Sequence, residues 1–208
     1  MSRPKNILRQ LGHPSGLLGR FILWRLNHIN RGMNDLTFSA LNLSDNDHVL
    51  EIGFGGGTLI ERILSKSKAQ VTGTDISTLA IEGARKRYKD AIYIGRLQLA
   101  PCESTSLPFK NGTFSRVCCV NVIYFWSDVS AMIAETHRIL DDGGQFIVCY
   151  QENAPDGIKK FPPDQIEIYL NTAGFTGVTT SHGADKLSRS YHCTVATKQL
   201  SNADNTLN

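Results

Sequence analysis

The sequence lacks several features that would place a protein in a special class. It has no apolar run near the roughly 20 residues that span a bilayer, so we expect a soluble protein. It has no Cys-x-x-Cys or Cys/His spacing, which argues against a zinc site. The five cysteines are an odd number, and we interpret them as reduced thiols of a cytoplasmic protein. Internal repeats are absent, and the 208 residues predict one domain with a short appendage.

Acidic residues are absent from the first 34 positions. These positions carry Arg3, Lys5, Arg9, Arg20, Arg25 and Arg31, a charge of +6, whereas the whole chain has +3 and the remainder therefore −3. Such an arm can attract phosphate, anionic lipid or an acidic substrate, or it can simply be a solvated helix face. Its composition also resembles a transit peptide, but arginines interrupt its apolar residues, so we interpret it as part of the mature protein.

Hydrophobic periodicity predicts an alternation of helices and strands. Within the arm, a helix is expected over residues 16–30, with apolar residues at helical spacing at Leu17, Leu18, Phe21, Trp24 and Ile29. A second helix follows over residues 34–41. Strands are then predicted over residues 48–52, 70–74, 97–99, 115–122, 144–150, 177–180 and 191–197. The helices between them are predicted over residues 58–65, 78–88, 129–140 and 163–173.

This alternation is typical of βαβ units and predicts a Rossmann-like α/β sandwich of three layers. Its seven-stranded sheet would be mostly parallel, with an antiparallel last strand. The domain would span residues 42–200, behind a helical arm or lid at 1–41 and before a flexible tail at 201–208. Ligands bind such sheets at the carboxyl ends of the strands, so the site is expected after the first strand.

The strongest local signal is the sequence VLEIGFGGGT from Val49 to Thr58. Its glycines allow a sharp turn beneath a ligand, and the next helix presents its first amides there. Asp75 ends the second strand, where a carboxylate can accept hydrogen bonds from ribose hydroxyls. NAD, FAD and S-adenosylmethionine proteins share these features. The NAD fingerprint, however, requires glycine or alanine in place of Thr58 and favours an apolar residue in place of Glu51.

At this point the sequence resembles the class I S-adenosylmethionine-dependent methyltransferases, especially their small-molecule branch in ubiquinone and menaquinone biosynthesis. The resemblance covers about residues 47–148, in ordered motifs: VLEIGFGGG at 49–57, GTDIS at 73–77, ESTSLPF at 103–109, NGTFS at 111–115 and HRILDDGG at 137–144. Two residues depart from the pattern, since Ser115 replaces an aspartate and Asp142 replaces a proline. These departures affect turn rigidity more than the site.

The resemblance implies which residues hold the cofactor. The methionine end would lie on the glycine loop and its neighbours, namely Glu51, Gly53, Phe54, Gly55, Gly57 and Asn121. Among these, Glu51 would hold the loop and interact with the cationic amino group. At the other end, Asp75 would bind both ribose hydroxyls and Ile76 would pack against adenine. Glu103 and the backbone of Ser104 would then bind the edge of the adenine ring.

The chemistry that this implies is an in-line displacement, which depends mainly on positioning two reactants. A base is needed only if the acceptor must first lose a proton, and our candidates for catalytic residues are Tyr124 and His13. The aromatic residues at 124–126 could favour a cation or could be core packing. Without room for an inserted substrate domain, the acceptor is expected to be a small, partly apolar molecule.

Two other functions remain open from the sequence. The arm could place the enzyme on a membrane surface as a lipid methyltransferase, since it combines apolar residues with Arg20 and Arg25. The chain could also be a non-catalytic, cofactor-binding subunit, although its intact motifs argue against decay of the site. We expect no metal and no nucleic-acid partner, weak membrane contact at most, and a monomer or homodimer.

Overall fold

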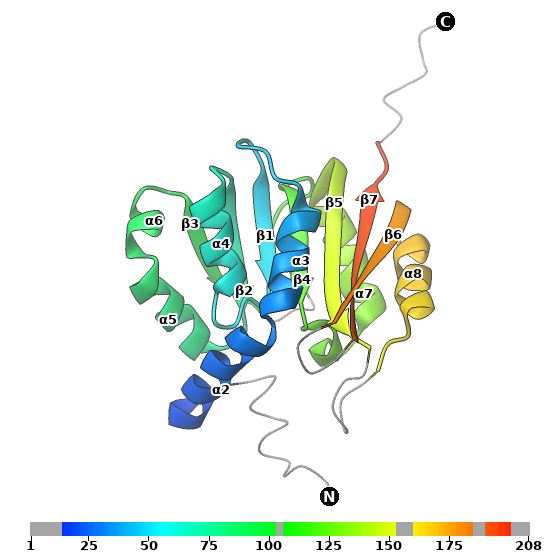
Figure 1. The fold of residues 1–208 in the computed structure, drawn as a ribbon. Helices are drawn as coiled ribbons and strands as arrows, with labels where there is room; N and C mark the ends of the chain where they lie inside the picture. Colours follow the sequence, from blue (N-terminus) through cyan, green and yellow to red (C-terminus); the bar gives the residue numbers. More distant parts are fainter. Residues whose placement is uncertain (1–13, 103–105, 153–159, 185–189, 201–208) are drawn as a thin grey trace, which may run out of the picture.

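The computed structural model describes residues 14–102, 106–152, 160–184 and 190–200 (Figure 1). Two helices come first, α2 (Gly16–Ile29) and α3 (Arg31–Leu41). The strands are β1 (His48–Ile52), β2 (Gln70–Asp75), β3 (Leu97–Pro101), β4 (Phe114–Val120), β5 (Leu140–Gln151), β6 (Phe175–Ala184) and β7 (Ser190–Lys198). The remaining helices are α4 (Thr58–Lys66), α5 (Thr78–Arg87), α6 (Lys89–Tyr93), the 3₁₀ turn η1 (Ile123–Phe125), α7 (Val129–Ile139) and α8 (Pro163–Thr172).

The seven strands form one sheet in the order β3-β2-β1-β4-β5-β7-β6. Strands β1 to β5 are parallel to their neighbours, and β7 is antiparallel to both β5 and β6. This confirms the predicted Rossmann-like sandwich with an antiparallel last strand. The strand order reverses between β1 and β4, and the carboxyl ends of these two strands therefore flank the crevice where such folds bind ligands.

Both faces of the central strands β1 and β4 are covered, which explains why these strands are nearly continuous apolar runs. Along β1, Val49 belongs to the cluster beneath α3, α4 and α5, whereas Leu50 belongs to the cluster beneath α7 and α8. Figure 1 shows α3 and α4 in front of the sheet and α7 behind it. No helix in the described part of the chain is long and apolar enough to cross a membrane.

Helix α3 packs directly on the sheet, where Met33 and Leu41 are fully buried. Its Gly32 contacts the ring of Tyr191 in β7, because a Cβ on Gly32 would lie 2.7 Å from the tyrosine hydroxyl oxygen. Gly183 of β6 contacts the same ring, and a Cβ there would overlap it. The tyrosine ring thus joins α3 to the far half of the sheet.

Several strand boundaries differ from those that the sequence predicted, and two of the differences have a clear cause. Strand β4 ends at Val120 rather than Val122, because Asn121 adopts a left-handed conformation with φ of 61°. Strand β5 begins at Leu140, which pairs with Phe114, rather than after a turn at residues 141–143. The register between β4 and β5 is irregular directly after that pair, so the glycine-rich stretch is absorbed as a distortion of the strand.

The apolar residues that predicted the first helix do not all pack on the domain. Leu18 and Phe21 of α2 are 50% and 55% exposed rather than packed on the domain. The side chains of Leu17 and Trp24 lie outside the described residues. The face of α2 that contacts the domain contains Leu23 and Asn27 instead, which approach the glycine loop.

Candidate cofactor-binding site

The glycine loop connects β1 to α4 at the crevice of the sheet. Gly53, Gly55 and Gly57 have φ values of 70°, 53° and 76°, a region that side chains other than glycine rarely adopt. A Cβ on Gly53 would also lie 2.7 Å from the side chain of Val122. Val122 is the second residue after the end of β4. Both the backbone conformation and the close approach of β4 therefore require glycine at position 53.

Asp75 ends β2 beside this loop. Its carboxylate accepts a hydrogen bond from the Gly55 amide at 2.8 Å and one from the Ser77 amide at 2.8 Å. The side chain is only 8% exposed. The parallel pairing of β1 and β2 brings Asp75 to the loop, since the two strands end at the same edge of the sheet. The sequence-predicted acid thus lies against the predicted glycine loop.

Glu51 is buried beneath the loop, with 3% of its surface exposed. Burial, and secondarily the charge of Asp75, raises the pKa of Glu51 to about 8, although a hydrogen bond from the backbone of Ile60 opposes the shift. Its Oε2 atom has no hydrogen-bond partner in the described structure. Since a buried polar atom without a partner is costly, this oxygen marks a place where a donor or cation is missing.

Asn121 holds a second buried oxygen without a partner at the same edge of the sheet. Its amide nitrogen donates to Asn30 Oδ1 at 3.2 Å, and its backbone N–H donates to the carbonyl of Cys149 at 2.7 Å. The Oδ1 atom has no hydrogen-bond partner among the described residues. Its left-handed backbone is a conformation that asparagine tolerates better than most residues do.

Side chains from α5 hold the loop from the other side. Tyr88 donates its hydroxyl hydrogen to the carbonyl of Gly57 at 2.9 Å, and Arg87 donates to the carbonyl of Gly56 at 3.1 Å. Phe54 is buried at 5% exposure, whereas Ile76 remains 40% exposed. A pocket of about 380 Å³ lies beside Ile76, lined by residues 14–16, 76–79 and Glu82.

Comparison with known proteins gives a consistent result. A family model described as a methyltransferase domain matches residues 50–148. A Bacillus subtilis protein named uncharacterized methyltransferase YdaC is 25% identical over 154 residues, which cover 72% of this chain and 82% of that protein. The ubiquinone/menaquinone biosynthesis C-methyltransferase UbiE of Citrifermentans bemidjiense is 31% identical over 124 residues, which cover 58% of this chain.

Residues 50–148 form a methyltransferase domain, and the chain is a methyltransferase. The predicted family and enzyme class are thereby confirmed. The chain spans about half the length of the UbiE relative, 52%. A solved Haemonchus contortus phosphoethanolamine N-methyltransferase 2 in complex with S-adenosyl-L-methionine shares the fold, with a TM-score of 0.71 and 15% identity over 81% of this chain and 52% of that chain.

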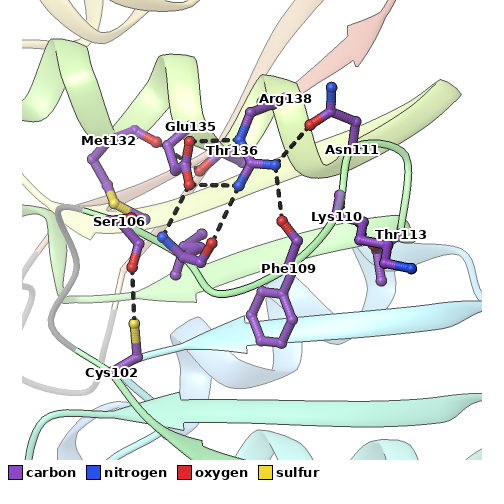
Figure 2. Close-up of polar contacts among 11 residues, drawn as sticks. Cys102, Ser106, Phe109, Lys110, Asn111, Thr113, Met132, Glu135, Thr136 and Arg138 are labelled. Carbon is purple, nitrogen blue, oxygen red and sulfur yellow. Dashed lines mark hydrogen bonds and ion pairs between the residues drawn. The ribbon is translucent and has the colours of Figure 1, made fainter.

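A polar network in this methyltransferase anchors the segment that leads into β4. Figure 2 shows Arg138 of α7 joined to Glu135 and to Phe109 and Asn111. Arg138 donates to the carbonyls of Leu107 at 3.2 Å and Phe109 at 2.8 Å. Glu135 accepts from the Leu107 amide at 3.0 Å. The i,i+3 spacing of the two charges was the available sequence signal for this pair.

The predicted adenine contacts in this methyltransferase, Glu103 and Ser104, lie outside the described residues. They directly precede the segment that the network of Arg138 and Glu135 fixes. Among the described residues that flank them, the Cys102 thiol donates to the carbonyl of Ser106 at 3.2 Å. Their predicted roles remain predictions.

Of the two candidate catalytic residues, His13 lies outside the described residues. Tyr124 lies in η1, where its hydroxyl donates to the Gln151 carbonyl at 2.8 Å and accepts from the amide of the same residue. Burial raises the pKa of Tyr124 well above its usual range. The hydroxyl is thus used to join η1 to the end of β5. Of its aromatic neighbours, Trp126 is buried and Phe125 is 41% exposed.

Proposed function

We propose that this methyltransferase binds S-adenosylmethionine at the glycine loop and transfers its methyl group to a small, partly apolar acceptor. The observation that carries the proposal is the pair of buried oxygens without partners, Glu51 Oε2 and Asn121 Oδ1, at the edge of the sheet where the loop turns. The cofactor's amino group offers the cationic donor that these acceptors lack. The geometry therefore fits the methionine end of the cofactor.

At the adenosine end, the proposal assigns Asp75 to the ribose hydroxyls and Ile76 to the face of the adenine ring. The exposed part of Ile76 and the adjoining pocket support this assignment, because an aromatic ring covers apolar surface that is otherwise in water. Glu103 and Ser104 would complete the adenine contacts. Gly53, Phe54, Gly55 and Gly57 would form the floor beneath the methionine part.

The bound cofactor would supply an electrophilic methyl group on its sulfonium sulfur. What the chain contributes is mainly orientation. The glycine loop and Asp75 would fix the cofactor, and the end of β4 with η1 would form a wall of the acceptor space. Positioning of this kind can contribute about 7–11 kcal/mol in well-oriented systems. Because the Tyr124 hydroxyl is bonded to backbone on both sides, we propose that it holds this wall rather than acting as a base.

The nature of the acceptor rests on the surface near the site. Phe125 of η1 is a large apolar side chain that remains 41% exposed beside the end of β4, and no contact of the cofactor has been assigned to it. The relative UbiE, named for quinone biosynthesis, supports an acceptor with an apolar body. The protein is assayed for methylation of a panel of small phenols, quinols and amines, and of RNA and protein. Methylation of RNA or protein only would overturn this part of the proposal.

The cofactor assignment is tested by calorimetric titration with S-adenosylmethionine and with its demethylated product, S-adenosylhomocysteine. The Asp75→Ala variant is expected to bind about 10- to 100-fold more weakly, since hydrogen bonds to a charged group contribute about 1.5–3 kcal/mol. The matched control is Asp90→Ala, which removes an exposed acid from α6 and should bind like the wild type. Absence of binding by folded wild-type protein would overturn the proposal.

One observation favours a contact with membranes as a second property. Leu18 and Phe21 are half exposed on α2, and the exposed Arg25 follows on the same helix. Apolar residues beside a basic residue can bind an anionic bilayer surface. Co-sedimentation with anionic liposomes that is lost in a Leu18→Ser, Phe21→Ser variant would support a lipid-like acceptor. A cytoplasmic location and a monomeric or homodimeric state remain our predictions, and we propose no nucleic-acid partner.

A further inference from the structure

One face of helix α2 lies directly on the glycine loop. Leu23, Asn27 and Asn30 follow each other at intervals of four and three residues, a spacing that places them on one side of the helix and its end. The Leu23 side chain lies 3.7 Å from the position of a Cβ on Gly55. Asn30 accepts the hydrogen bond from Asn121 at 3.2 Å. The helix therefore touches both the loop and the end of β4.

Gly56 explains how Asn27 fits onto this loop. Gly53, Gly55 and Gly57 have left-handed backbone angles, whereas the φ of Gly56 lies outside that region. A Cβ at position 56 would nevertheless overlap the amide group of Asn27. The fourth glycine of the sequence thus provides space for a side chain of the arm, and the turn itself does not require it.

The residues directly before α2 contact the adenosine end of the same proposed site. The buried hydroxyl of Ser77 donates to the carbonyl of Pro14 at 2.9 Å. Residues 14–16 also line the pocket beside Ile76. A helix of 14 residues is about 21 Å long at 1.5 Å per residue. Helix α2 consequently extends from the adenosine end to the methionine end of the proposed site.

We propose that residues 14–30 form the roof of the cofactor site, with Asn27 and Asn30 as the residues that hold it closed. Asn27 fills the space above Gly56, and Asn30 positions Asn121, whose remaining oxygen receives the cofactor's amino group. Cofactor binding and docking of α2 then stabilise each other, and the cofactor leaves only after α2 lifts. This inference rests on the proposed function, because the ligand that it encloses is S-adenosylmethionine or its product.

The test measures affinity and dissociation rate of S-adenosylhomocysteine for three variants: Gly56→Ala, Asn27→Ala and Asn30→Ala. Asn27→Ala and Asn30→Ala each remove one contact of the roof, and Gly56→Ala places a methyl group where the Asn27 side chain lies. Each variant is expected to weaken binding roughly three- to tenfold, mainly through faster dissociation, as the loss of one hydrogen bond or contact predicts. The matched control is Arg25→Ala, an exposed residue of the same helix that should behave like the wild type. Urea unfolding verifies that each variant is folded.

A double variant separates the roof from a general disturbance of the loop. Alanine at position 27 makes room for a Cβ at position 56, so Gly56→Ala combined with Asn27→Ala should bind no more weakly than Asn27→Ala alone. If the two substitutions weakened binding additively, the proposed contact between Asn27 and Gly56 would be wrong. Hydrogen exchange gives a second readout, because saturating S-adenosylhomocysteine should slow exchange of the α2 amides several-fold.

The possible failures can be told apart. If the wild type binds S-adenosylhomocysteine but all three variants bind and release it at wild-type rates, the roof is wrong and the proposed function stands. Unchanged α2 exchange on saturation leads to the same conclusion. If the folded wild type does not bind the ligand, the proposed function fails, and the roof fails with it.

Discussion

Glu51 of β1 and Glu135 of α7 are both largely withdrawn from solvent, yet their pKa values shift in opposite directions. Burial raises the pKa of Glu51 to about 8, and one of its oxygens has no partner. Hydrogen bonds from Arg138 are the main cause that lowers the pKa of Glu135. Glu135 belongs to a network in which the arginine donates five hydrogen bonds.

This difference indicates that Glu135 has a structural role and that Glu51 belongs to the ligand-binding site. Arg138 has five N–H donors, and the five bonds satisfy the guanidinium with acceptors from its own chain. Glu51 lies among backbone and apolar atoms that provide too few donors. A protein that leaves a buried carboxylate incompletely satisfied loses stability, and it can recover that free energy when a ligand supplies the missing donor.

The largest expected effect comes from Glu51→Gln. Between pH 4.5 and 8 the folded wild type binds more protons at this position than the unfolded chain, so its stability falls as the pH rises through that window. Glutamine removes this penalty, and at pH 8.5 the variant should be more stable by on the order of 3 kcal/mol, with little difference near pH 5. Thermal unfolding at the two pH values measures this change.

The same Glu51→Gln variant should bind S-adenosylhomocysteine at least tenfold more weakly, since a neutral amide replaces the carboxylate that faces the amino group. Greater stability together with weaker binding identifies a functional residue. Equal or tighter binding would place Glu51 in the scaffold and remove the contrast with Glu135.

Arg138→Lys tests the scaffold side of the comparison. Lysine keeps the charge but lacks the planar fork, so the carbonyls of Leu107 and Phe109 lose their donors. We expect a loss of about 2 kcal/mol in the free energy of unfolding, measured by urea denaturation. Binding of S-adenosylhomocysteine should weaken only several-fold. A loss of binding without a loss of stability would show that the network belongs to the site.

Tyr124→Phe gives a smaller effect and decides between a structural and a catalytic role. Without the hydroxyl, the amide and carbonyl of the buried Gln151 lose a partner, and unfolding should become about 1 kcal/mol easier. Methyl transfer to an identified acceptor should continue at a rate within a few-fold of the wild type. A loss of turnover by a factor of 100 or more, with unchanged stability, would restore Tyr124 as a catalytic residue.

The smallest expected effect is on the stability of the protein at low pH, to which Glu135 contributes. Because its folded pKa is lowered, the stabilisation from this pair is present above pH 4.5 and is lost as the pH falls through the lower folded value. Glu135→Gln should therefore flatten the decline in stability below pH 4.5, by less than about 1 kcal/mol, since Arg138 is partly exposed. The contribution of Glu135 to stability thus grows as the pH rises, whereas that of Glu51 declines. If both contributions changed with pH in the same direction, the proposed contrast between the two glutamates would be wrong.

The sequence was sufficient for the fold and for the glycine loop because local signals determine both. Apolar runs of β1 and β4, and the glycines between β1 and α4, predict a parallel sheet with a loop at its edge. The boundary at Asn121 could not be predicted in this way, since a left-handed asparagine looks like any other polar residue. The long start of β5 depends on pairing between Leu140 and Phe114, a contact between distant residues.

The role of the arm was partly missed for a similar reason. The spacing of its apolar residues predicted a helix but not which side contacts the domain, and the structure exposes Leu18 and Phe21 while Leu23 and Asn27 make the contacts. The sequence did contain one further signal, since the glycine cluster holds four glycines where three have left-handed angles. The role of the fourth glycine, Gly56, becomes clear only from the structure, which places Asn27 against it.

Tyr191 and the two glycines that contact it form a set whose sizes must match. Gly32 lies in the first turn of α3, and glycine is a weaker helix former than alanine, by about 1 kcal/mol in a helix interior, so helix propensity does not favour it. A large ring at position 191 excludes any side chain at positions 32 and 183. These three positions should therefore change together among homologues, with a larger residue at 32 or 183 accompanied by a smaller one at 191.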